Sequence, residues 1–510
     1  MIVQDQTDVS KFLEDPASHG RDAATVAAIT THISVIFLVG PRVFKLKRAV
    51  RLPYVDFSTP ARRLDACRRE LDLNRRTAPM LYVDVRRITR EADGRLAFDG
   101  QGELVDAVVE MVRFDENTLF DRMASEGRLT PVLLTRLART IARFHSDAAI
   151  SHHGGGAAGI ASVLEGNERA LAATDVFDAG TIASLTSGLR AFLRRHEALL
   201  DARGRAGKVR RCHGDLHLRN ICLVDGTPTL FDCLEFDEAI ATVDVLYDLA
   251  FLLMDLWHHG RAADANLVFN RYLDECDETD GLSLMPFFMA IRATVRAHVA
   301  ATQLEQAPDS HRPALVSEAR AYAALALRLL APAPVRLVAI GGLSGTGKST
   351  VAAAIASAIG PAPGARVLAS DRIRKRLHGV RAEVRLPSEA YEPEVSERVY
   401  AALMQEARAV LGAGHAVVAD AVFDRRAARE RIEHVARDAQ VPFMGVWLHA
   451  RPDTLFGRVD ARRGDPSDAT VDVVRAQLQH QDVPADWRRI ATDRGIAATV
   501  SKVREAIGTA

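Results

Sequence analysis

A glycine-rich segment at residues 342–349, with the sequence GLSGTGKS, constrains the fold of this chain more than any other feature. It fits the pattern G-x-x-x-x-G-K-[ST] in full. The apolar run 335–340 precedes it, and an alanine-rich stretch with helical character, 350–359, follows it. A buried strand, a tight glycine loop and a helix in that order are typical of a parallel α/β sheet. The sequence therefore predicts an α/β domain that begins near residue 335.

The same pattern predicts a phosphate-binding loop. Glycines allow successive backbone N–H groups to turn inward around a phosphate, and a helix N-terminus adds the positive end of its dipole. Lys348 is expected to bridge the β- and γ-phosphates of ATP, and the Ser349 hydroxyl to bind Mg²⁺. A glycine turn that merely starts a helix is the alternative. The predicted nucleotide contacts of the loop are Gly342, Ser344, Gly345, Thr346, Gly347, Lys348, Ser349 and Thr350.

Two later carboxylates favour a small-molecule kinase. Asp371 follows the end of the predicted strand 366–370, where it can accept a proton from an acceptor hydroxyl or act as the N-cap of the next helix. Asp420 follows the apolar run 416–419, an arrangement that holds Mg²⁺ through water, with a turn or N-cap aspartate as the alternative. We therefore expect Asp371 to be catalytic and Asp420 to be a metal ligand.

A basic segment near the C-terminus resembles a closing lid. Arg458, Arg462 and Arg463 precede the polar stretch 464–468. A basic helix that ends in a polar loop can bring cations onto a transferring phosphoryl group. A solvated arginine face is the alternative for each residue. We expect Arg458 and Arg462 to contact the nucleotide.

Residues 335–510 resemble the P-loop small-molecule kinase family, which includes gluconate kinase, polynucleotide 5′-kinase and zeta-toxin-like kinases. The resemblance implies ATP with Mg²⁺ and a hydroxyl acceptor near Asp371. It also implies that Arg372 or Arg374 contacts the acceptor.

A second motif lies upstream at residues 213–220, HGDLHLRN, which fits H-x-D-x-x-x-x-N. Asp232 comes twelve residues after Asn220, at the end of an apolar run. Phosphoryl transfer requires a carboxylate beside the acceptor hydroxyl and metal ligands that bridge the phosphates. One loop can present Asp215 as the base and, five residues later, Asn220 as a neutral oxygen ligand. The spacing predicts a second phosphoryl-transfer site, with a polar loop rich in His and Asp as the alternative.

These residues look like the aminoglycoside phosphotransferase and choline-kinase branch of the protein-kinase-like fold. The resemblance implies that Asp215 is the catalytic base and that His213 orders the loop. It implies that Asn220 and Asp232 bind Mg²⁺, and it makes Asp248 a structural anchor beneath the loop.

The resemblance extends to the upstream lysine strand. Lys45 and Lys47 share strand parity and so point to the same face, and Lys45 is preferred as the phosphate-binding lysine. Glu70 is the candidate ion-pair partner, with a solvated surface glutamate as the alternative. Residues 110–113 fall where the adenine-binding hinge is expected. The apolar-rich runs 33–38 and 42–47, joined by a Gly-Pro turn, predict a β-hairpin, and residues 61–74 have helical spacing. No G-x-G-x-x-G loop precedes this hairpin, and residues 30–34 occupy its place.

We expect two domains joined by a short linker, with a fold class of α/β and α+β. A bilobal protein-kinase-like domain over residues 1–330 would have a small β-rich lobe, about 28–112, and a helical lobe, about 113–330. The stiff segment 331–334 (APAP) is the predicted linker, and a P-loop parallel-sheet kinase domain would span 335–510. This order resembles bacterial fusions of an aminoglycoside phosphotransferase-like module with an ATP-binding module.

Composition argues against several other classes of protein. The 66 Lys and Arg residues balance the 66 Asp and Glu residues, which argues against a protein built to coat nucleic acid or a membrane. We find no run of 18 apolar residues, no signal-peptide-like start and no C-x-x-C among the five cysteines. The expected location is cytoplasmic. The expected partner is a small-molecule hydroxyl acceptor, without nucleic acid or membrane.

The sequence thus predicts a bifunctional, Mg²⁺-dependent phosphotransferase that moves the γ-phosphoryl group of ATP to small-molecule hydroxyls at two separate sites. The alternative is one catalytic P-loop module regulated by a nucleotide-sensing or inactive kinase-like module. A nucleic-acid-processing ATPase is a third class of function. The zero net charge argues against it. The acidic stretch 274–280 could line a cationic acceptor pocket or form a solvated interhelical loop.

Overall fold

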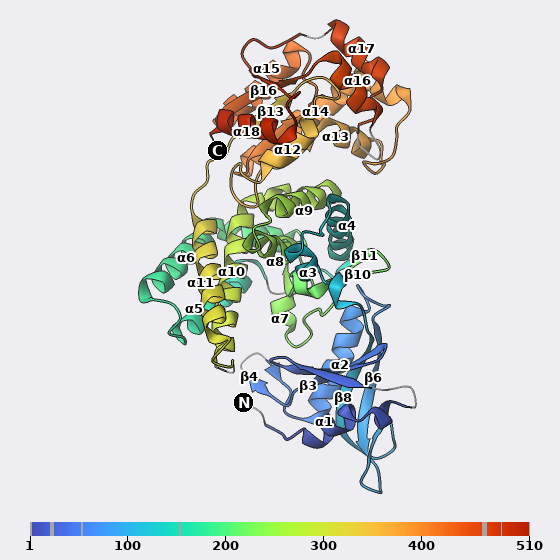
Figure 1. Ribbon diagram of the computed structural model, residues 1–510. Coiled ribbons are helices and arrows are strands. Elements are labelled where there is room, and N and C mark those ends of the chain that lie inside the picture. Colours follow the sequence, from blue (N-terminus) through green and yellow to red (C-terminus); the bar gives the residue numbers. More distant parts are fainter. Residues whose placement is uncertain are drawn as a thin grey trace. The chain divides into compact units, whose positions relative to one another are not determined.

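The computed structural model describes residues 3–20, 25–52, 55–151, 155–305, 307–461, 467–480 and 482–508 (Figure 1). The chain divides into two compact units. The first contains Met1–Gly166 and Leu193–Asp255, and the second contains Asn167–Phe192 and Leu256–Ala510. This division differs from the predicted domain boundary at residues 331–334, which stays a prediction. The mixed α/β character expected from the sequence is confirmed.

The first unit contains an antiparallel six-stranded sheet with the order β1-β2-β3-β8-β6-β7. The predicted hairpin is β2 (Ser34–Val39) and β3 (Arg42–Lys47), joined by a turn in which Gly40 has a φ of 51°. That left-handed backbone favours glycine. The remaining strands of this sheet are β1 (Val26–Thr30), β6 (Tyr82–Arg90), β7 (Leu96–Phe98) and β8 (Glu103–Val112).

Helix α2 (Pro60–Asn74) packs against this sheet because its apolar residues recur at helical spacing. Thr59 caps its start by accepting a hydrogen bond from the Arg62 N–H, and Pro60 occupies the first helical position. Cys67 and Leu71 are buried in the cluster that includes Tyr82 of β6 and Val109 of β8. This packing turns Glu70 toward the sheet, where it is fully buried.

The segment that contains the HGD motif connects short strands and helices. Strands β9 (Val209–Arg211) and β12 (Thr242–Asp244) form an antiparallel pair, and β10 (Ile221–Val224) and β11 (Thr227–Leu230) form a hairpin. The other elements that lie wholly or partly in the first unit are α1 (Thr7–Glu14), η1 (Pro16–His19), β4 (Arg51–Leu52), β5 (Val55–Asp56), η2 (Glu116–Thr118), α3 (Phe120–Ser125), α4 (Pro131–Asp147), α5 (Gly156–Ala172), α6 (Ala179–Arg205), η3 (Leu218–Asn220), α7 (Glu238–Ala241) and α8 (Val245–His258).

The second unit is built around a parallel five-stranded sheet with the order β14-β15-β13-β16-β17. Its central strand, β13 (Leu337–Gly341), is buried along its whole length, as the continuous apolar run predicts. The other strands are β14 (Arg366–Ala369), β15 (Val417–Asp420), β16 (Phe443–His449) and β17 (Arg488–Ala491). Parallel strands bring their carboxyl ends to one edge of the sheet, and this edge holds the phosphate loop.

Helices cover this sheet and extend the second unit. Helix α12 (Lys348–Ala356) packs with α18 (Ile496–Ile507), and α14 (Pro393–Gly412) packs with α13 (Ser370–Leu377) and α15 (Arg426–Asp438) (Figure 1). The remaining elements are α9 (Ala262–Glu275), η4 (Thr279–Leu284), α10 (Met285–Gln303), α11 (Arg312–Leu330), η5 (Ser388–Tyr391), α16 (Pro452–Asp460) and α17 (Val471–His480).

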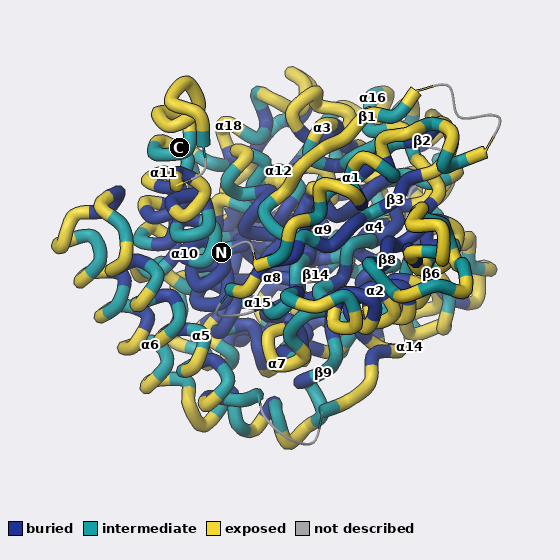
Figure 2. The backbone as a smooth tube through the Cα atoms, turned by 90° about the horizontal axis from the view of Figure 1, so that it is seen from below, coloured by how far each residue is buried: buried dark blue, intermediate teal, exposed yellow. Residues whose placement is uncertain are grey.

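Buried residues follow the elements that form the cores of the two units. Figure 2 shows them along β3 and β8 of the first sheet and along α10 of the second unit. Helix α6, by contrast, is mainly exposed or half-buried. No helix in the described part of the chain has the length and apolar character needed to cross a bilayer.

One buried histidine makes the second unit sensitive to acid. His415 is fully buried, its Nε2 donates a hydrogen bond to Gly364 O at 2.9 Å, and its Nδ1 has no partner among the described residues. Burial lowers the pKa of His415 to about 4. Protonation would place a charge and an unpaired N–H in the core, so the folded state binds fewer protons than the unfolded state between the two pKa values.

We therefore expect the stabilising effect of neutral His415 to be complete above about pH 6.5, the unfolded value, and to disappear as the pH falls to about 4. The loss is about 3 kcal/mol. Urea unfolding can be followed by tryptophan fluorescence, because Trp257, Trp447 and Trp487 all lie in the second unit. A His415→Gln variant should lose less stability over this pH range than the wild type. Parallel losses in the two proteins would contradict the assignment.

Candidate active sites

Lys45 lies between two carboxylates that come from distant parts of the chain. Its Nζ is 2.8 Å from Glu70 Oε1 on α2 and 2.5 Å from Asp232 Oδ1. Glu70 is fully buried, whereas 12% of the Lys45 side chain and 40% of the Asp232 side chain are exposed. The structure thus forms the expected Lys45–Glu70 ion pair, and Glu70 is not a solvated surface residue. The exposed side of this network faces solvent through Asp232.

Lys47 points to the same face of β3 as Lys45, as the strand parity predicts, but it has a different environment. It is fully buried and pairs with both Glu70 and Glu235, and its Nζ lies 5.6 Å from the centre of the Phe57 ring. Burial alone would lower the pKa of Lys47, but the attraction of Glu235 and Glu70 outweighs it and raises the pKa. Lys47 is therefore a cation that neutralises buried carboxylates, and Lys45 is the lysine with access to the open side.

Asp248 of α8 holds the start of the HGD loop in place. Its Oδ1 accepts a hydrogen bond from the Gly214 N–H at 2.8 Å, and its Oδ2 accepts one from the His213 N–H at 3.2 Å. His145 Nε2 lies 3.1 Å from the same Oδ2. His145, Cys212 and Asp248 lie close enough to resemble a metal cluster, but the Asp248 oxygens already accept these hydrogen bonds. The group is structural, and Cys212 is fully buried in it.

Asp215 is held in the loop by its neighbours while 39% of its side chain stays exposed. Asn220 Nδ2 donates to Asp215 Oδ2 at 3.0 Å and to Asp215 O at 2.9 Å. His217 Nε2 lies 3.3 Å from Asp215 Oδ2. His213 is fully buried, and its Nε2 donates to Phe231 O at 2.9 Å. This arrangement orients the Asp215 carboxylate and leaves the Asn220 amide oxygen for another partner.

The turn that presents Asp232 is built by residues that the sequence did not single out. Asp232 has a φ of 62°, a left-handed conformation that costs a non-glycine residue about 1–2 kcal/mol. The Asp232 N–H donates to Tyr82 Oη at 3.1 Å, and the Cys233 N–H donates to Asn74 Oδ1 at 2.8 Å. Asn74 in turn donates to Glu70 O at 2.9 Å. Helix α2 therefore positions both Glu70 and the strained turn that carries Asp232.

Backbone groups at the expected nucleotide-binding edge of the first unit already have partners. The Val112 N–H donates to Leu81 O, and the Arg113 N–H donates to Pro41 O. In the loop between β1 and β2, Thr31 Oγ1 accepts a hydrogen bond from the Ser34 N–H at 3.0 Å. This loop lies where a glycine-rich loop would be expected, and the side chain of Thr31 closes it.

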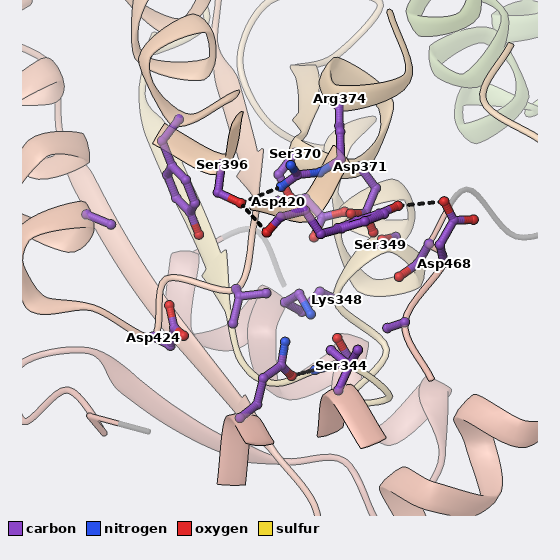
Figure 3. Close-up of a pocket in the computed structure, with 18 of the residues that line it drawn as sticks. Ser344, Lys348, Ser349, Ser370, Asp371, Arg374, Ser396, Asp420, Asp424 and Asp468 are labelled. Atoms are coloured by element: carbon purple, nitrogen blue, oxygen red, sulfur yellow. Dashed lines mark hydrogen bonds between the residues drawn. The ribbon is translucent and has the colours of Figure 1, made fainter. Parts of the chain in front are cut away.

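The second candidate site is a cavity of about 930 Å³ at the carboxyl edge of the parallel sheet (Figure 3). The phosphate loop contributes Lys348 and Ser349 to its wall, the end of β15 contributes Asp420, and α13 contributes Asp371. Asp420 is 3% exposed. Asp371 lies in the first turn of α13, whose N-cap is Ala369, so the alternative of Asp371 as the N-cap is wrong. The four residues expected from the sequence therefore surround one space.

The phosphate loop has a conformation that requires glycine. Gly342 and Gly345 have φ values of 137° and 89°, and a Cβ atom on them would lie 2.3 Å from Leu448 O and 2.8 Å from Leu455 O. Thr346 is 1% exposed and donates through Oγ1 to Leu343 O, so its side chain stabilises the loop. Thr350 also lines the cavity.

Two contacts of the loop were not foreseen. The Ser344 N–H donates to Gln477 Oε1 of α17 at 2.9 Å, so an amide oxygen occupies a backbone donor that the sequence predicts to bind phosphate. Arg458 of α16 donates to Gly345 O at 3.4 Å and to Thr492 O at 2.8 Å. Arg458 thus contacts the backbone of the loop, and its expected contact with the nucleotide stays a prediction. Arg462 and Arg463 lie outside the described residues.

The two arginines expected on the acceptor side have different positions. Arg374 lines the cavity, donates to Ala390 O at 2.6 Å and lies 4.7 Å from the centre of the Tyr391 ring. Arg372 pairs instead with Asp274 at 3.1 Å. Asp274 is therefore neither part of a solvated loop nor available to a cationic acceptor, which corrects both expectations for this residue. It belongs to helix α9 and lies among three arginines, with 15% of its side chain exposed.

Two family models match separate parts of the chain. A model of the phosphotransferase enzyme family matches residues 16–284, and a model of an AAA domain matches residues 337–484. Uncharacterized proteins of Mycobacterium tuberculosis (strain H37Rv) and Mycobacterium bovis are each 31% identical over 466 residues, which is 90% of this chain and 90% of theirs.

Solved structures resemble separate parts of the chain. A choline/ethanolamine kinase family protein from Mesorhizobium loti is 12% identical, covers 64% of this chain and 99% of its own, and has a TM-score of 0.40. The APS kinase CysC of Mycobacterium tuberculosis is 23% identical, covers 35% of this chain and 99% of its own, and has a TM-score of 0.26.

The environments of the two lysines predict opposite phenotypes. Lys47→Met leaves the buried carboxylates of Glu70 and Glu235 with less positive charge and should lower the free energy of unfolding by about 3–5 kcal/mol. Lys45→Met leaves Glu70 paired with Lys47 and should cost less stability, but it should weaken nucleotide binding at this site. Hydrogen exchange of the β8 amides measures the first effect. Calorimetry with ATP in a Lys348→Ala background measures the second.

A larger stability loss for Lys45→Met, together with unchanged nucleotide binding, would assign the phosphate-binding role to Lys47 instead.

Proposed function

The chain belongs to the phosphotransferase enzyme family and is a kinase, and from this premise we propose that it is bifunctional, with two Mg²⁺-dependent ATP sites that each transfer the γ-phosphoryl group to a small-molecule hydroxyl. The observation that carries the proposal is the cavity of about 930 Å³, where Lys348 and Ser349 meet Asp371 and Asp420. Phosphoryl transfer is catalysed mainly by positioning and charge, and this space offers a cation, metal ligands and a base.

At the first site, Lys45 would bind the phosphates and Asp215 would accept the proton of the acceptor hydroxyl. The Asp215 carboxylate is already oriented by Asn220 Nδ2 and His217 Nε2, so it needs little rearrangement to act as a base. The Asp232 carboxylate and the Asn220 amide oxygen form a hard oxygen donor set that fits Mg²⁺. The metal would neutralise charge on the phosphates when bound.

At the second site, Lys348 would contact the β- and γ-phosphates, and the phosphate loop would bind the nucleotide through its backbone N–H groups. The Ser349 hydroxyl and the Asp420 carboxylate are oxygen donors of the kind that Mg²⁺ prefers. Asp371 would accept the proton of the acceptor hydroxyl, and Arg374 would contact the acceptor. The side-chain amide of Gln477 must leave the Ser344 N–H if that donor is to bind phosphate.

A specific feature of the first unit supports the alternative function, in which this unit is a nucleotide-sensing or inactive kinase-like module that regulates the second. Its loop at Thr31 is closed by a hydrogen bond to Ser34, and the N–H groups of Val112 and Arg113 donate within the protein. These contacts leave fewer backbone donors for a nucleotide. In this alternative, only the second site consumes ATP.

Single and double variants separate the two functions. If both sites turn over, Lys348→Ala and Asp215→Ala should each remove part of the Mg²⁺-dependent ATP consumption, and the double variant should remove nearly all of it. Loss of the base alone should slow its own site by about 10²–10⁴-fold. ATP consumption and new phosphorylated species should be measured with a metabolite extract as the source of acceptors. Lys11→Ala and Asp72→Ala, at exposed positions, are matched controls.

If Lys348→Ala alone abolishes all turnover, the first unit is the sensor. Wild-type turnover in the double variant would overturn the proposal for both sites.

A further inference from the structure

Helix α13 carries Asp371, yet it has little apolar surface to hold it in place. Its sequence is SDRIRKRL, in which Ile373 is buried and Leu377 is 53% exposed. An isolated helix of eight residues is not stable in water, so tertiary contacts must fix its position. Those contacts come chiefly from its cations.

The four cations of α13 contact several other segments of the second unit. Arg374 donates to Ala390 O, and Lys375 donates to Val384 O and pairs with Asp468. Arg376 pairs with Glu406 of α14, and Arg372 pairs with Asp274 of α9. The orientation of the helix therefore depends on a set of polar tethers that surround it.

Asp274 has three arginine partners, more than the other carboxylates of this set. Its Oδ1 lies 2.8 Å from Arg366 Nη1, and its Oδ2 lies 2.6 Å from Arg271 Nη1 and 3.1 Å from Arg372 Nη1. Burial alone would raise the pKa of Asp274, but the three arginines outweigh it and hold the pKa at about 2. The carboxylate is charged at neutral pH and joins α9, β14 and α13 at one point.

Helix α9 also covers the edge of the parallel sheet. Asn270 Oδ1 accepts a hydrogen bond from the Val367 N–H of β14 at 2.7 Å, and the side-chain amide of Asn266 donates to Ala365 O at 3.0 Å. Arg366 Nη1 donates to Asn270 O at 2.9 Å. Because β14 is the edge strand, α9 supplies the partners that a further strand would otherwise provide. Helix α9 is thus fixed to the strand that leads into α13.

We propose that Asp274 is a positioning residue for the second site. It orients Asp371 through its ion pair with Arg372. Residue 274 lies in the segment 16–284 that the phosphotransferase family model matches, so this segment contributes to the P-loop site as well as to its own. The proposal rests on the proposed function of Asp371 as the base.

The physical link is the geometry of one helical turn. Asp371 and Arg372 are consecutive and project about 100° apart around the helix. A tether from Arg372 to α9 therefore fixes the rotation of α13 that directs Asp371 to the cavity. A displacement of about 1 Å in a catalytic group can reduce the rate about 10²-fold. Nucleotide contacts lie on the phosphate loop and do not depend on this rotation.

The test uses the full chain with Asp215→Ala, which silences the first site. Arg372→Ala removes the tether and leaves Asp274 paired with Arg366 and Arg271. We expect it to lower kcat for Mg²⁺-dependent ATP consumption, measured with a metabolite extract as the source of acceptors, at least tenfold with KM for ATP unchanged. Arg372→Lys, which keeps the charge, should restore part of kcat. Hydrogen exchange of residues 370–377 should become faster in Arg372→Ala.

Asn266→Ala is the matched control, because it removes hydrogen bonds between α9 and Ala365 without touching Arg372. It should lower Tm but keep kcat within twofold. The proposal is overturned if Arg372→Ala also keeps kcat within twofold, or if both variants lose kcat in proportion to Tm.

Failure of the proposed function has a different signature: the Asp215→Ala protein then shows no turnover that Lys348→Ala removes. In that case the exchange measurement decides, since unchanged exchange at residues 370–377 overturns the positioning role and faster exchange supports it.

Discussion

Buried carboxylates determine the arrangement of both candidate sites. A carboxylate taken out of water costs several kcal/mol unless a cation or several hydrogen-bond donors compensate it. Glu70 in the first unit is compensated by Lys45 and Lys47, and Asp274 in the second by three arginines. Asp248 is compensated by backbone N–H groups instead. In each case the compensating group belongs to the segment that carries out the proposed chemistry or leads into it.

Local features of the fold could be predicted because they depend on neighbouring residues. The hairpin of β2 and β3, helix α2 and the strand–loop–helix around residue 345 all follow from apolar periodicity and glycine turns. The placement of Asp371 and Asp420 also follows, because parallel strands bring their carboxyl ends together. The pairing of Lys45 with Glu70 came from a family resemblance, since a separation of 25 positions fixes no geometry by itself.

Contacts between distant segments could not be predicted in the same way. Tyr82 and Asn74 support the Asp232 turn through hydrogen bonds that span about 150 residues, and no local pattern marks them. Arg372 and Arg374 are equivalent in sequence, and only the packing of α13 decides which one reaches the cavity. In the sequence, Asp274 belongs to an acidic stretch that was interpreted as a solvated loop or an acceptor pocket. Two of its three arginine partners lie about a hundred positions later, so no local pattern indicates them.

The amide side chains that line the edge of β14 have an evolutionary consequence. A gene cut at residues 331–334 would yield a P-loop protein whose outer strand exposes N–H and C=O groups to other chains, which is the geometry of edge-to-edge aggregation. A protein that begins at that point is therefore expected to aggregate more readily than the full chain, even if it retains every candidate catalytic residue of the second site. Helix α9 thus makes the second kinase segment depend on residues of the first. A P-loop protein without α9 needs another element to cover the edge of β14.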